Sequence, residues 1–504
     1  MTSRDRLGTL AKYMQDEVEI RRAKLDRLVS IGAEPYASAT ARDTSCGDAA
    51  GHFDKLSAAE TRITLAGRVM TTRVHGALVF ADMQDESGKL QILLKEGEIS
   101  DDLFALFRDC VDPGDIVEAT GMLFVTKRGE KTLNVSAWKM LSKALLPLPE
   151  KWHGLQDIEK RFRERELDLI SNPDVKRRFL MRSKLIASLR RFLDERNFVE
   201  VETPILQTIP GGANARPFVT HHHALDIDLY MRIAPELYLK RLVVGGFEKV
   251  YEIGRCFRNE GIDYAHNPEF TMIELYWAYA SKEGYMSFLE EMISTIVRAT
   301  VGETRIVQEG GEAIDFTAPY PRVTFREAIL NACGIDIDGL ATEQDVIAAA
   351  KKRKLSIDFK DCHGMGEHFD ELYKKTARPS IIQPTWVFDY PSELKPLAGV
   401  HPDDPTKSAS CQLVVMGAEV VNAYYHELSD PLMQRAHLEA QQALREQGSE
   451  VAQRIDEEFL RALEHGMPPT SGMGFGIDRL AAFLTGAPSL KEVILFPTLR
   501  PEQP

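Results

Sequence analysis

Apolar residues recur at loosely helical spacing among charged residues from position 4 to 31, and this pattern ends near Gly32. An amphipathic helix has this periodicity, so the pattern predicts an N-terminal helix. The next stretch, SATARDTSCGDAAG at 38–51, is small and polar and favours a loop. We therefore expect residues 1–60 to form a helical N-terminal extension.

From Arg62 the pattern changes to short runs in which apolar and polar residues alternate, as in strands with one buried face. A helical run at 104–111 interrupts these strands. Short strands with one interposed helix over residues 61–147 predict a five-stranded OB barrel, a fold that commonly binds oligonucleotides. Another small β barrel or sandwich is the alternative interpretation of the same pattern.

The predicted barrel offers side chains that suit unpaired bases. Aromatic rings and guanidinium groups stack on bases, while amides and carboxylates hydrogen-bond to base edges. The candidate base-contacting residues are Arg68, Phe80, Gln91 and Glu130. Taken singly, each of them also fits a plain core or surface role.

Prolines in the stretch LLPLPEKWHGLQD at 145–157 disfavour both helix and central strand. We expect a linker at 148–168 and a second domain at 169–504, and RFRERELDLI at 161–170 has the pattern of an amphipathic helix. Within that domain, FVEVETPILQ at 198–207 predicts a strand that stops at Pro204. Helical runs at roughly 283–380 predict a helical insertion.

Composition bounds the class of protein. With 44% hydrophobic and 27% charged residues, the chain can bury large cores, which excludes global disorder. A net charge of −14 disfavours counterion-driven binding to nucleic acid, DNA included, yet permits a selective RNA enzyme with local basic strips.

Signals for membrane insertion and export are also lacking in the sequence. No stretch approaches the ~20 apolar residues that span a bilayer, and the charged N-terminus has no signal-peptide core. The six cysteines are scattered without a CxxC pair, so reduced thiols are expected and a zinc site is not. We expect a cytoplasmic protein with no membrane partner.

Three segments carry a resemblance to a known family. FEKVYEIGRCFRNEG followed by HNPEFTMIELYWAY resembles motif 2 of the class II aminoacyl-tRNA synthetases, and GMGFGIDRLAAFL resembles motif 3. FVEVETPIL resembles motif 1, the unit that forms the dimer interface in that class. PGGANARPF, APELYLKRL and HNPEFTM are similar to the lysyl-tRNA synthetases of subclass IIb in particular.

This resemblance covers nearly the whole chain and implies both fold and activity. The implied fold is an α+β multidomain one, with an anticodon-binding OB barrel and a catalytic domain built on an antiparallel β-sheet flanked by helices. The implied activity is ATP-dependent activation of L-lysine and its transfer to the 3′ end of tRNA-Lys by a homodimer. ATP is then a substrate, Mg²⁺ a cofactor, and the four barrel residues named above are anticodon-binding.

The resemblance also assigns site residues. Arg258 would bridge the lysine carboxylate and the α-phosphate, and Arg479 would hold the γ-phosphate, because guanidinium forks fit pairs of oxygens. The implied ATP-binding residues are Arg258, Glu260, His266, Asn267, Phe270, Glu419 and Arg479. The implied lysine-binding residues are Gly212, Glu236, Arg258, Glu274, Tyr276, Asn422, Tyr424 and Glu427. The carboxylates in the second set suit an ammonium substrate.

The chain departs from the familiar bacterial lysine enzymes in residues 408–428. Those enzymes carry an acid inside a DRFE-like run, where this chain reads SASCQL, so Gln412 and Glu419 occupy the two metal positions. An amide is a poorer Mg²⁺ ligand than a carboxylate, so the number or placement of ions is expected to differ.

Two further departures lie close to the site. NAYYHELSD is one residue longer than the usual run, which leaves the positions of Tyr424, Tyr425 and Glu427 open by one; a local bulge would absorb the extra residue. We expect Glu427 to face the ε-ammonium group. Ala265 stands where many relatives have a basic residue.

Two alternative functions remain open at this point. One is an enzyme that lysylates a protein, but such enzymes lack an anticodon-binding domain and this chain has a candidate one. The other is a noncatalytic RNA-binding, amino-acid-sensing paralogue. Four retained residues disfavour it, namely Arg258, Glu260, His266 and Arg479.

Overall fold

A computed structural model describes residues 3–149, 155, 157–261, 263, 266–307, 311–446, 449 and 452–501, with side chains from residue 15 onward. The chain divides into two compact units, Met1–Leu155 and Gln156–Pro504. Among the described residues, no helix combines the length and the apolar character that crossing a bilayer requires.

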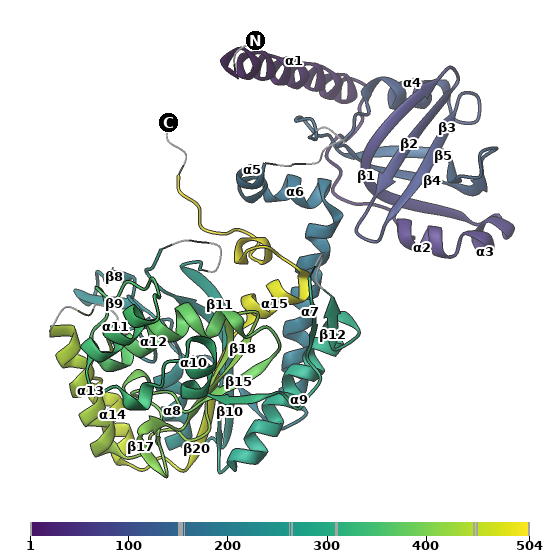
Figure 1. Ribbon diagram of the computed structural model, residues 1–504. Helices are drawn as coiled ribbons and strands as arrows, with labels where there is room; N and C mark the ends of the chain where they lie inside the picture. The colour runs from purple at the N-terminus through teal and green to yellow at the C-terminus, as the bar shows by residue number, and fades with distance from the viewer. Residues whose placement is uncertain are drawn as a thin grey trace. The chain divides into compact units, whose positions relative to one another are not determined.

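The first unit is a closed barrel with strand order β1-β2-β3-β5-β4 (Figure 1). Its strands are β1 (Arg62–His75), β2 (Leu78–Gln84), β3 (Lys89–Lys95), β4 (Ile116–Val125) and β5 (Lys131–Ser142), with α4 (Asp101–Cys110) between β3 and β4 in the chain. Residues of β2 alternate between buried and half-buried, which is the pattern that predicted the strand. The predicted five-stranded OB barrel is confirmed.

Three helices precede the barrel: α1 (Ser3–Ser30), α2 (Cys46–Gly51) and α3 (Phe53–Ala58). The expected N-terminal helix is α1. The loop expected at 38–51 is wrong at its end, because α2 starts there. The Ser45 side chain caps α2 by accepting a hydrogen bond from the backbone of Asp48, and Ala49 is buried in the barrel core.

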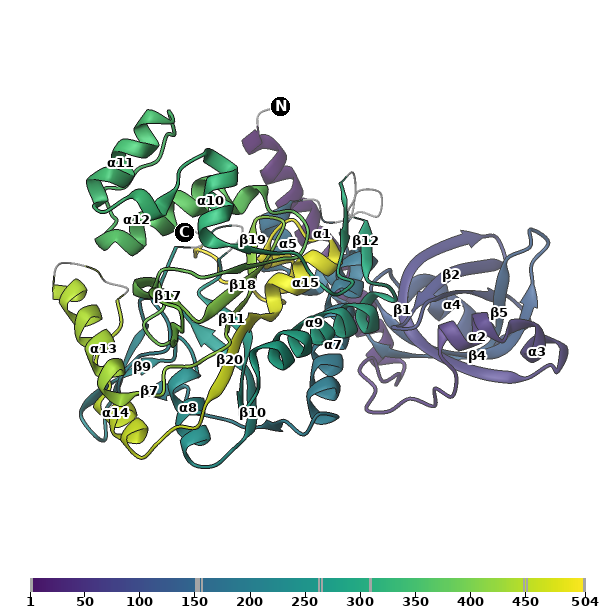
Figure 2. The same cartoon turned by 60° about the horizontal axis from the view of Figure 1, so that its bottom comes forward.

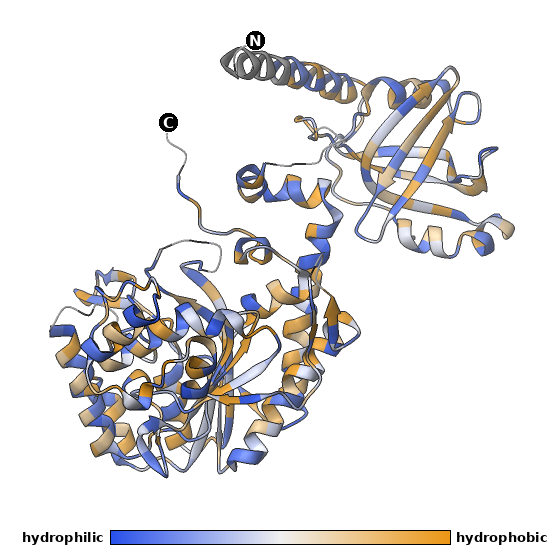
Figure 3. Ribbon diagram, in the orientation of Figure 1, coloured by the Kyte–Doolittle hydropathy of each residue, from blue (hydrophilic) through white to orange (hydrophobic). Residues whose placement is uncertain are grey.

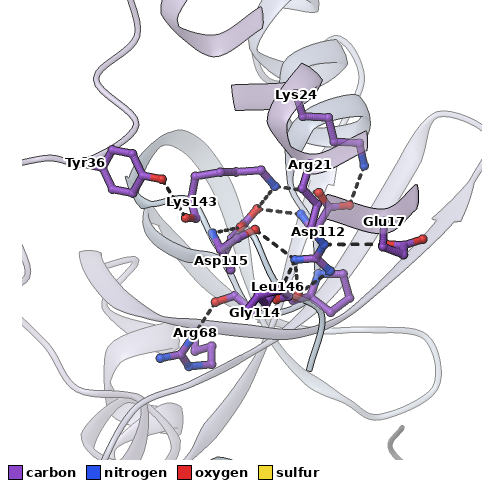
Figure 4. A network of polar contacts seen from close by, with 12 residues as sticks. Glu17, Arg21, Lys24, Tyr36, Arg68, Asp112, Gly114, Asp115, Lys143 and Leu146 are labelled. Carbon is purple, nitrogen blue, oxygen red and sulfur yellow. Dashed lines mark hydrogen bonds and ion pairs between the residues drawn. The ribbon is translucent and has the colours of Figure 1, made fainter. Parts of the chain in front are cut away.

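A polar network ties α1 to the turn that precedes β4 (Figure 4). The Arg21 guanidinium donates to the Pro113 carbonyl at 3.1 Å, and Lys24 pairs with Asp112 at 2.5 Å. Lys143, fully buried at the end of the barrel, pairs with the same aspartate at 2.6 Å. These contacts hold the second half of α1 against the barrel.

The second unit is built on an eight-stranded sheet of order β14-β15-β18-β19-β20-β11-β10-β6 (Figure 2). Neighbouring strands are antiparallel except at the two edges, where β14 with β15 and β6 with β10 are parallel. The strands are β6 (Val199–Glu200), β10 (Lys249–Phe257), β11 (Glu269–Ala278), β14 (Arg322–Thr324), β15 (Thr385–Phe388), β18 (Ser410–Val415), β19 (Ala418–Tyr424) and β20 (Thr470–Gly476). The expected antiparallel sheet is confirmed.

Helices cover this sheet and close its cores. α7 (Pro173–Asp194), α9 (Lys282–Val301) and α15 (Ile477–Thr485) pack into the largest core, while α8 (Glu236–Val244), α13 (Pro431–Glu446) and α14 (Glu457–Glu464) belong to another. Hydrophobic residues gather on the strands and on the inner faces of these helices (Figure 3).

Two segments differ from their expected form. The strand expected to run from 198 and stop at Pro204 is reduced to β6, and after the proline a separate strand, β7 (Leu206–Gln207), joins a small sheet with β8 (Val219–His222) and β9 (Ile227–Met231). Residues 158–168, expected as linker, form α5 (Ile158–Arg163) and the start of α6 (Arg165–Ser171), and α6 confirms the helix predicted at 161–170. Arg165 is fully buried and donates to the Leu495 carbonyl, so this segment packs within the second unit.

The segment expected as a helical insertion at 283–380 is mixed. Most of α9 packs in the main core and β14 joins the main sheet, whereas α10 (Phe325–Cys333), α11 (Glu343–Lys352) and α12 (Gly364–Thr376) form a separate cluster. The remaining elements are β12 (Arg305–Val307), β13 (Ala313–Asp315), η1 (Ile337–Gly339), η2 (Arg378–Ser380), η3 (Ser392–Leu394), β16 (Val400–His401), β17 (Asp404–Ser408) and η4 (Leu490–Val493).

Candidate functional site

A central cavity of about 270 Å³ lies over strands β19, β20 and β11 of the large sheet. All the residues expected from the sequence to bind ATP, lysine or Mg²⁺ line this one cavity. They come from segments as distant in the chain as Gly212 and Arg479. The fold therefore gathers the complete candidate set at one place.

Glycines of β20 make the floor of the cavity. Gly472 lies between Tyr276 and Tyr424 on the neighbouring strands, and Gly474 lies between Glu274 and Asn422. A Cβ atom at Gly472 would come within 2.3 Å of a Glu427 carboxylate oxygen and 2.5 Å of the Tyr276 ring. The alternating glycines of GMGFG thus leave room for the side chains of both flanking strands.

One end of the cavity, here called the acidic end, holds three buried carboxylates from Glu236, Glu274 and Glu427. Lys240, fully buried one helical turn after Glu236, contacts Glu236 at 2.8 Å and Glu427 at 2.7 Å. The sequence interpretation did not include Lys240. Its signal was the spacing of four residues between an acid and a base on one helix face.

The carboxylates of the acidic end carry unusual protonation equilibria. Burial raises the pKa of Glu427 to about 8, and burial together with the charge of Glu236 raises the pKa of Glu274 well above its ordinary value. The Tyr276 hydroxyl donates to Glu274 at 3.3 Å, while Glu427 Oε1 has no hydrogen-bond partner. With three carboxylates around one lysine, this end favours a further cation.

The opposite end, here called the phosphate end, is formed by guanidinium groups. Arg258 lies with Cζ 5.1 Å from the centre of the Phe270 ring, and its buried Nε has no hydrogen-bond partner. Arg479, at the start of α15, donates to the backbone carbonyl of Glu419 at 2.8 Å. Burial lowers the pKa of Arg479. No carboxylate pairs with either guanidinium among the described residues, so both suit anionic oxygens.

The loop that follows β10 carries three further candidates. The His266 ring nitrogen Nδ1 lies 2.9 Å from an Asp263 carboxylate oxygen, and Glu260 is exposed at the cavity wall. Asn267 donates to the Glu269 carbonyl at 2.6 Å, which leaves its buried Oδ1 without a partner. Ala265, where the sequence departs from many relatives, lies outside the described residues.

The two candidate metal positions have different surroundings. Gln412 Oε1 accepts a hydrogen bond from the Tyr390 hydroxyl at 2.7 Å, and Gln412 Nε2 donates to Asn422 Oδ1 at 3.3 Å. The side chain of Glu419 has neither hydrogen bond nor ion pair with another described residue. The described part of the chain holds no group of three acids, histidines or cysteines arranged for a metal.

The far wall follows one register. The cavity is lined by Tyr424, which is the last residue of β19, and by Glu427. The Tyr425 ring instead packs against Phe388, with the two ring centroids 6.1 Å apart. The Glu427 backbone donates to the Thr470 carbonyl, which fixes this residue beside β20. The pairing of β18 with β19 also skips one residue, Val420, so β19 has a bulge ahead of the run 422–430; the bulge expected within that run stays a prediction.

The barrel candidates lie mainly on one outer face. On β2, the half-buried Phe80 shares one face with Asp82 and Gln84. Arg68 of β1 lies opposite Gln84, and Gln91 of β3 lies opposite Asp82, so both residues are on the same face as Phe80. Arg68 donates to the Gly114 carbonyl at 2.7 Å (Figure 4), Gln91 accepts from Thr132 at 3.0 Å, and Glu130 is exposed between β4 and β5. Three of the four residues therefore share a surface.

Two protein families match this chain. Residues 157–500 match the family described as tRNA synthetases class II (D, K and N), and residues 63–141 match the OB-fold nucleic acid binding domain. The first match falls within the second unit and the second match within the first. Both units are thereby similar to known domains.

Proteins named Lysine--tRNA ligase are similar over almost the full chain. The one from Moorella thermoacetica is 47% identical over 490 residues, which cover 97% of this chain and 98% of the relative. The one from Bacillus subtilis is 44% identical over 492 residues, with the same shares. The one from a Roseiflexus species is 48% identical over 482 residues, or 95% and 98%. The similarity spans both units.

Proposed function

The chain belongs to the lysine–tRNA ligases within the class II tRNA synthetases, and we propose that it activates L-lysine with ATP and transfers it to tRNA-Lys. The observation that supports lysine is the acidic end of the cavity, with three buried carboxylates beside one internal lysine. The likeness to full-length tRNA ligases gives no support to a sensor or a protein-lysylating enzyme.

The reaction needs positioning more than acid–base chemistry. The lysine carboxylate, already ionised, attacks the α-phosphorus of ATP, and the bond to pyrophosphate breaks as the lysyl-adenylate forms. Arg258 bridges the attacking carboxylate and the α-phosphate, and Arg479 holds the γ-phosphate. In the second step a ribose hydroxyl at the 3′ end of the tRNA attacks the lysyl carbonyl, and AMP leaves.

The acidic end would hold both amino groups of the substrate. Glu236 and the backbone of Gly212 receive the α-ammonium, and Glu274, Tyr276 and Glu427 receive the ε-ammonium. Asn422 and Tyr424 complete the far wall. A neutral side chain of the same length would bring no second cation to these three buried acids, which share only Lys240, and this gives strong discrimination.

The phosphate end would hold ATP. Phe270 stacks on the adenine, the exposed Glu260 accepts from its amino group, and His266 approaches the terminal phosphates. Asn267, with an unpartnered buried oxygen, lies beside them. This division places the two substrates at opposite ends of one cavity.

The two metal positions differ in their fit to Mg²⁺. Glu419 fits, because its carboxylate is not engaged by any other described side chain and faces the cavity. Mg²⁺ held there would neutralise phosphate charge. Gln412 does not fit, because its neutral amide is engaged by Tyr390 and Asn422.

The remaining parts of the proposal concern partners and location. The barrel face with Arg68, Phe80 and Gln91, together with Glu130, would read the anticodon. A homodimer is supported by exposed apolar side chains near the segment that resembles motif 1, namely Leu180, Val199, Ile205, Leu206, Val219, Leu225 and Ile227. All six cysteines are unpaired, as in a reducing cytoplasm.

Two assays test this proposal together. We expect lysine-dependent exchange of pyrophosphate with ATP, and lysine-dependent charging of tRNA-Lys. Absence of exchange at saturating lysine would favour the amino-acid sensor. Exchange without charging would favour an enzyme that lysylates a protein.

A further inference from the structure

Lys395 is a lysine of the central cavity that the sequence interpretation and the proposed function do not use. It follows η3 directly and lines the cavity together with Gln412, Glu419 and Asn422. Its Nζ donates to Asn422 Oδ1 at 2.9 Å and lies 5.1 Å from the centre of the Tyr390 ring. The ammonium group is therefore held in a defined place.

A chain of hydrogen bonds connects Lys395 to the altered metal position. The Tyr390 hydroxyl donates to Gln412 Oε1, Gln412 Nε2 donates to Asn422 Oδ1, and the same Asn422 oxygen receives the Lys395 ammonium. Gln412 thus uses both ends of its amide within the protein. The two neutral amides, Gln412 and Asn422, link the Tyr390 hydroxyl to the Lys395 ammonium, which also lies over the Tyr390 ring.

This arrangement disfavours a divalent ion beside Gln412. A carboxylate there would offer a charged oxygen ligand, whereas the amide offers a neutral oxygen that already accepts from a hydroxyl. An ion in that place would also lie near the ammonium of Lys395, and the two like charges repel each other. Burial lowers the pKa of Lys395, whereas the carboxylates of Glu419, Asp370 and Glu236 favour its charged form and Lys374 opposes it.

A role for the Lys395 ammonium rests on the proposed function, because the anion that it would contact is the ATP of that reaction. We infer that the Lys395 ammonium takes the place of one divalent ion and contacts the phosphate groups of ATP. The chain then binds one Mg²⁺ fewer than an enzyme with an acid at position 412. An ammonium can do this because it is a compact positive charge with three donors.

The number of bound metal ions tests the inference without turnover. Mn²⁺ binding is measured by equilibrium dialysis and electron paramagnetic resonance with saturating AMPPCP and no lysine, because this ATP analogue keeps the cleavable α–β bridge and would react if lysine were present. The double variant Lys395→Met with Gln412→Glu is expected to bind one Mn²⁺ more per site than the unaltered protein. Equal numbers would overturn the inference.

Single variants separate the charge from the fold. Gln412→Glu alone is expected to gain no ion, because the new carboxylate pairs with Lys395; a gained ion would contradict the inference. Lys395→Met is expected to bind AMPPCP about 10-fold more weakly at saturating Mg²⁺, and Lys395→Arg to stay close to the unaltered protein. Equal affinity in the methionine variant would overturn the inference.

A matched lysine serves as control. Lys407 pairs with Asp404 at 3.0 Å on β17 and does not line the cavity, so Lys407→Met is expected to change neither the ion count nor the affinity for AMPPCP. The proposed function is read separately, from lysine-dependent exchange in the unaltered protein. Normal exchange with equal ion counts would overturn only the role of Lys395, whereas lack of exchange would overturn the proposed function.

Discussion

The two ends of the central cavity carry groups of opposite charge. The acidic end is closed from water and contains three carboxylates around the fully buried Lys240. The phosphate end contains Arg258 and Arg479, both partly accessible and paired with no described carboxylate. Because the two ends carry opposite charges, the acidic end attracts a cationic side chain and the phosphate end attracts a polyanion. The charges of the cavity therefore orient both substrates.

The largest expected effect is at the phosphate end. Arg258→Ala should lower the rate of pyrophosphate exchange by about 10³-fold, because removal of one group that stabilises developing charge costs roughly this much. Circular dichroism and the thermal midpoint should stay unchanged. Arg177→Ala removes an exposed arginine and serves as control. Exchange near the parental rate in the Arg258 variant would exclude the proposed bridging role.

At the acidic end, Glu427→Gln should raise KM for lysine in the exchange assay by about 100-fold. The amide keeps the shape but removes a buried charge partner of the ammonium. KM for ATP should change less than about 3-fold, because the substitution lies at the other end. Equal rises in KM for lysine and in KM for ATP would show that the two ends do not bind the two substrates separately.

The barrel gives a further contrast with the cavity. Phe80→Ala should raise KM for tRNA by about 10-fold, since loss of one base-stacking ring costs about 1–3 kcal/mol. Pyrophosphate exchange, which needs no tRNA, should be spared. Similar losses in both assays would refute this separation.

The smallest expected effect concerns pH. The pKa of Glu427, about 8, means that much of this carboxyl is protonated at pH 7 in the free protein. Binding of the ε-ammonium favours the ionised form, so affinity for lysine should rise as pH increases through 8. Calorimetry in buffers of different ionisation enthalpy should detect proton release at pH 7. Proton uptake on lysine binding at pH 7 would contradict this prediction.

The pH dependence of folding stability has the opposite sign to the pH dependence of lysine binding. Because the folded-state pKa of Glu427 is raised from 4.5, its contribution to stability is fully present below pH 4.5 and is lost as pH rises through about 8. Lysine at the site should offset this loss. The acidic end is thus a region in which local stability and substrate affinity oppose each other.

Much of the cavity could be predicted because the motifs have local spacing. Glu274 and Tyr276 alternate along one strand, so a motif match to β11 predicts that both side chains face the cavity. The hydrogen bond of Lys395 to Asn422 could not be predicted, because it joins residues 27 positions apart through tertiary contact. The pair of Lys240 with Glu427 spans a still longer stretch of chain.

The fold shows the same division. Alternating patterns predicted the barrel strands, and helical periodicity predicted α1. The short helix α2 was missed because small polar residues also occur in loops; the Ser45 cap and the burial of Cys46 and Ala49 against the barrel stabilise it. Likewise, the prolines near 150 indicated a linker, but the buried hydrogen bonds of Arg165 show that helical packing starts soon afterwards.

The most direct test of lysine as the substrate compares it with norleucine, which has the same chain length but no ε-ammonium. Pyrophosphate exchange should proceed with lysine and be at least about 10³-fold less efficient, in kcat/KM, with norleucine, because norleucine brings no ammonium to Glu274 and Glu427 and leaves Lys240 as the cation of the acidic end. Comparable exchange with the two amino acids would contradict the central claim that the acidic end selects an ammonium side chain.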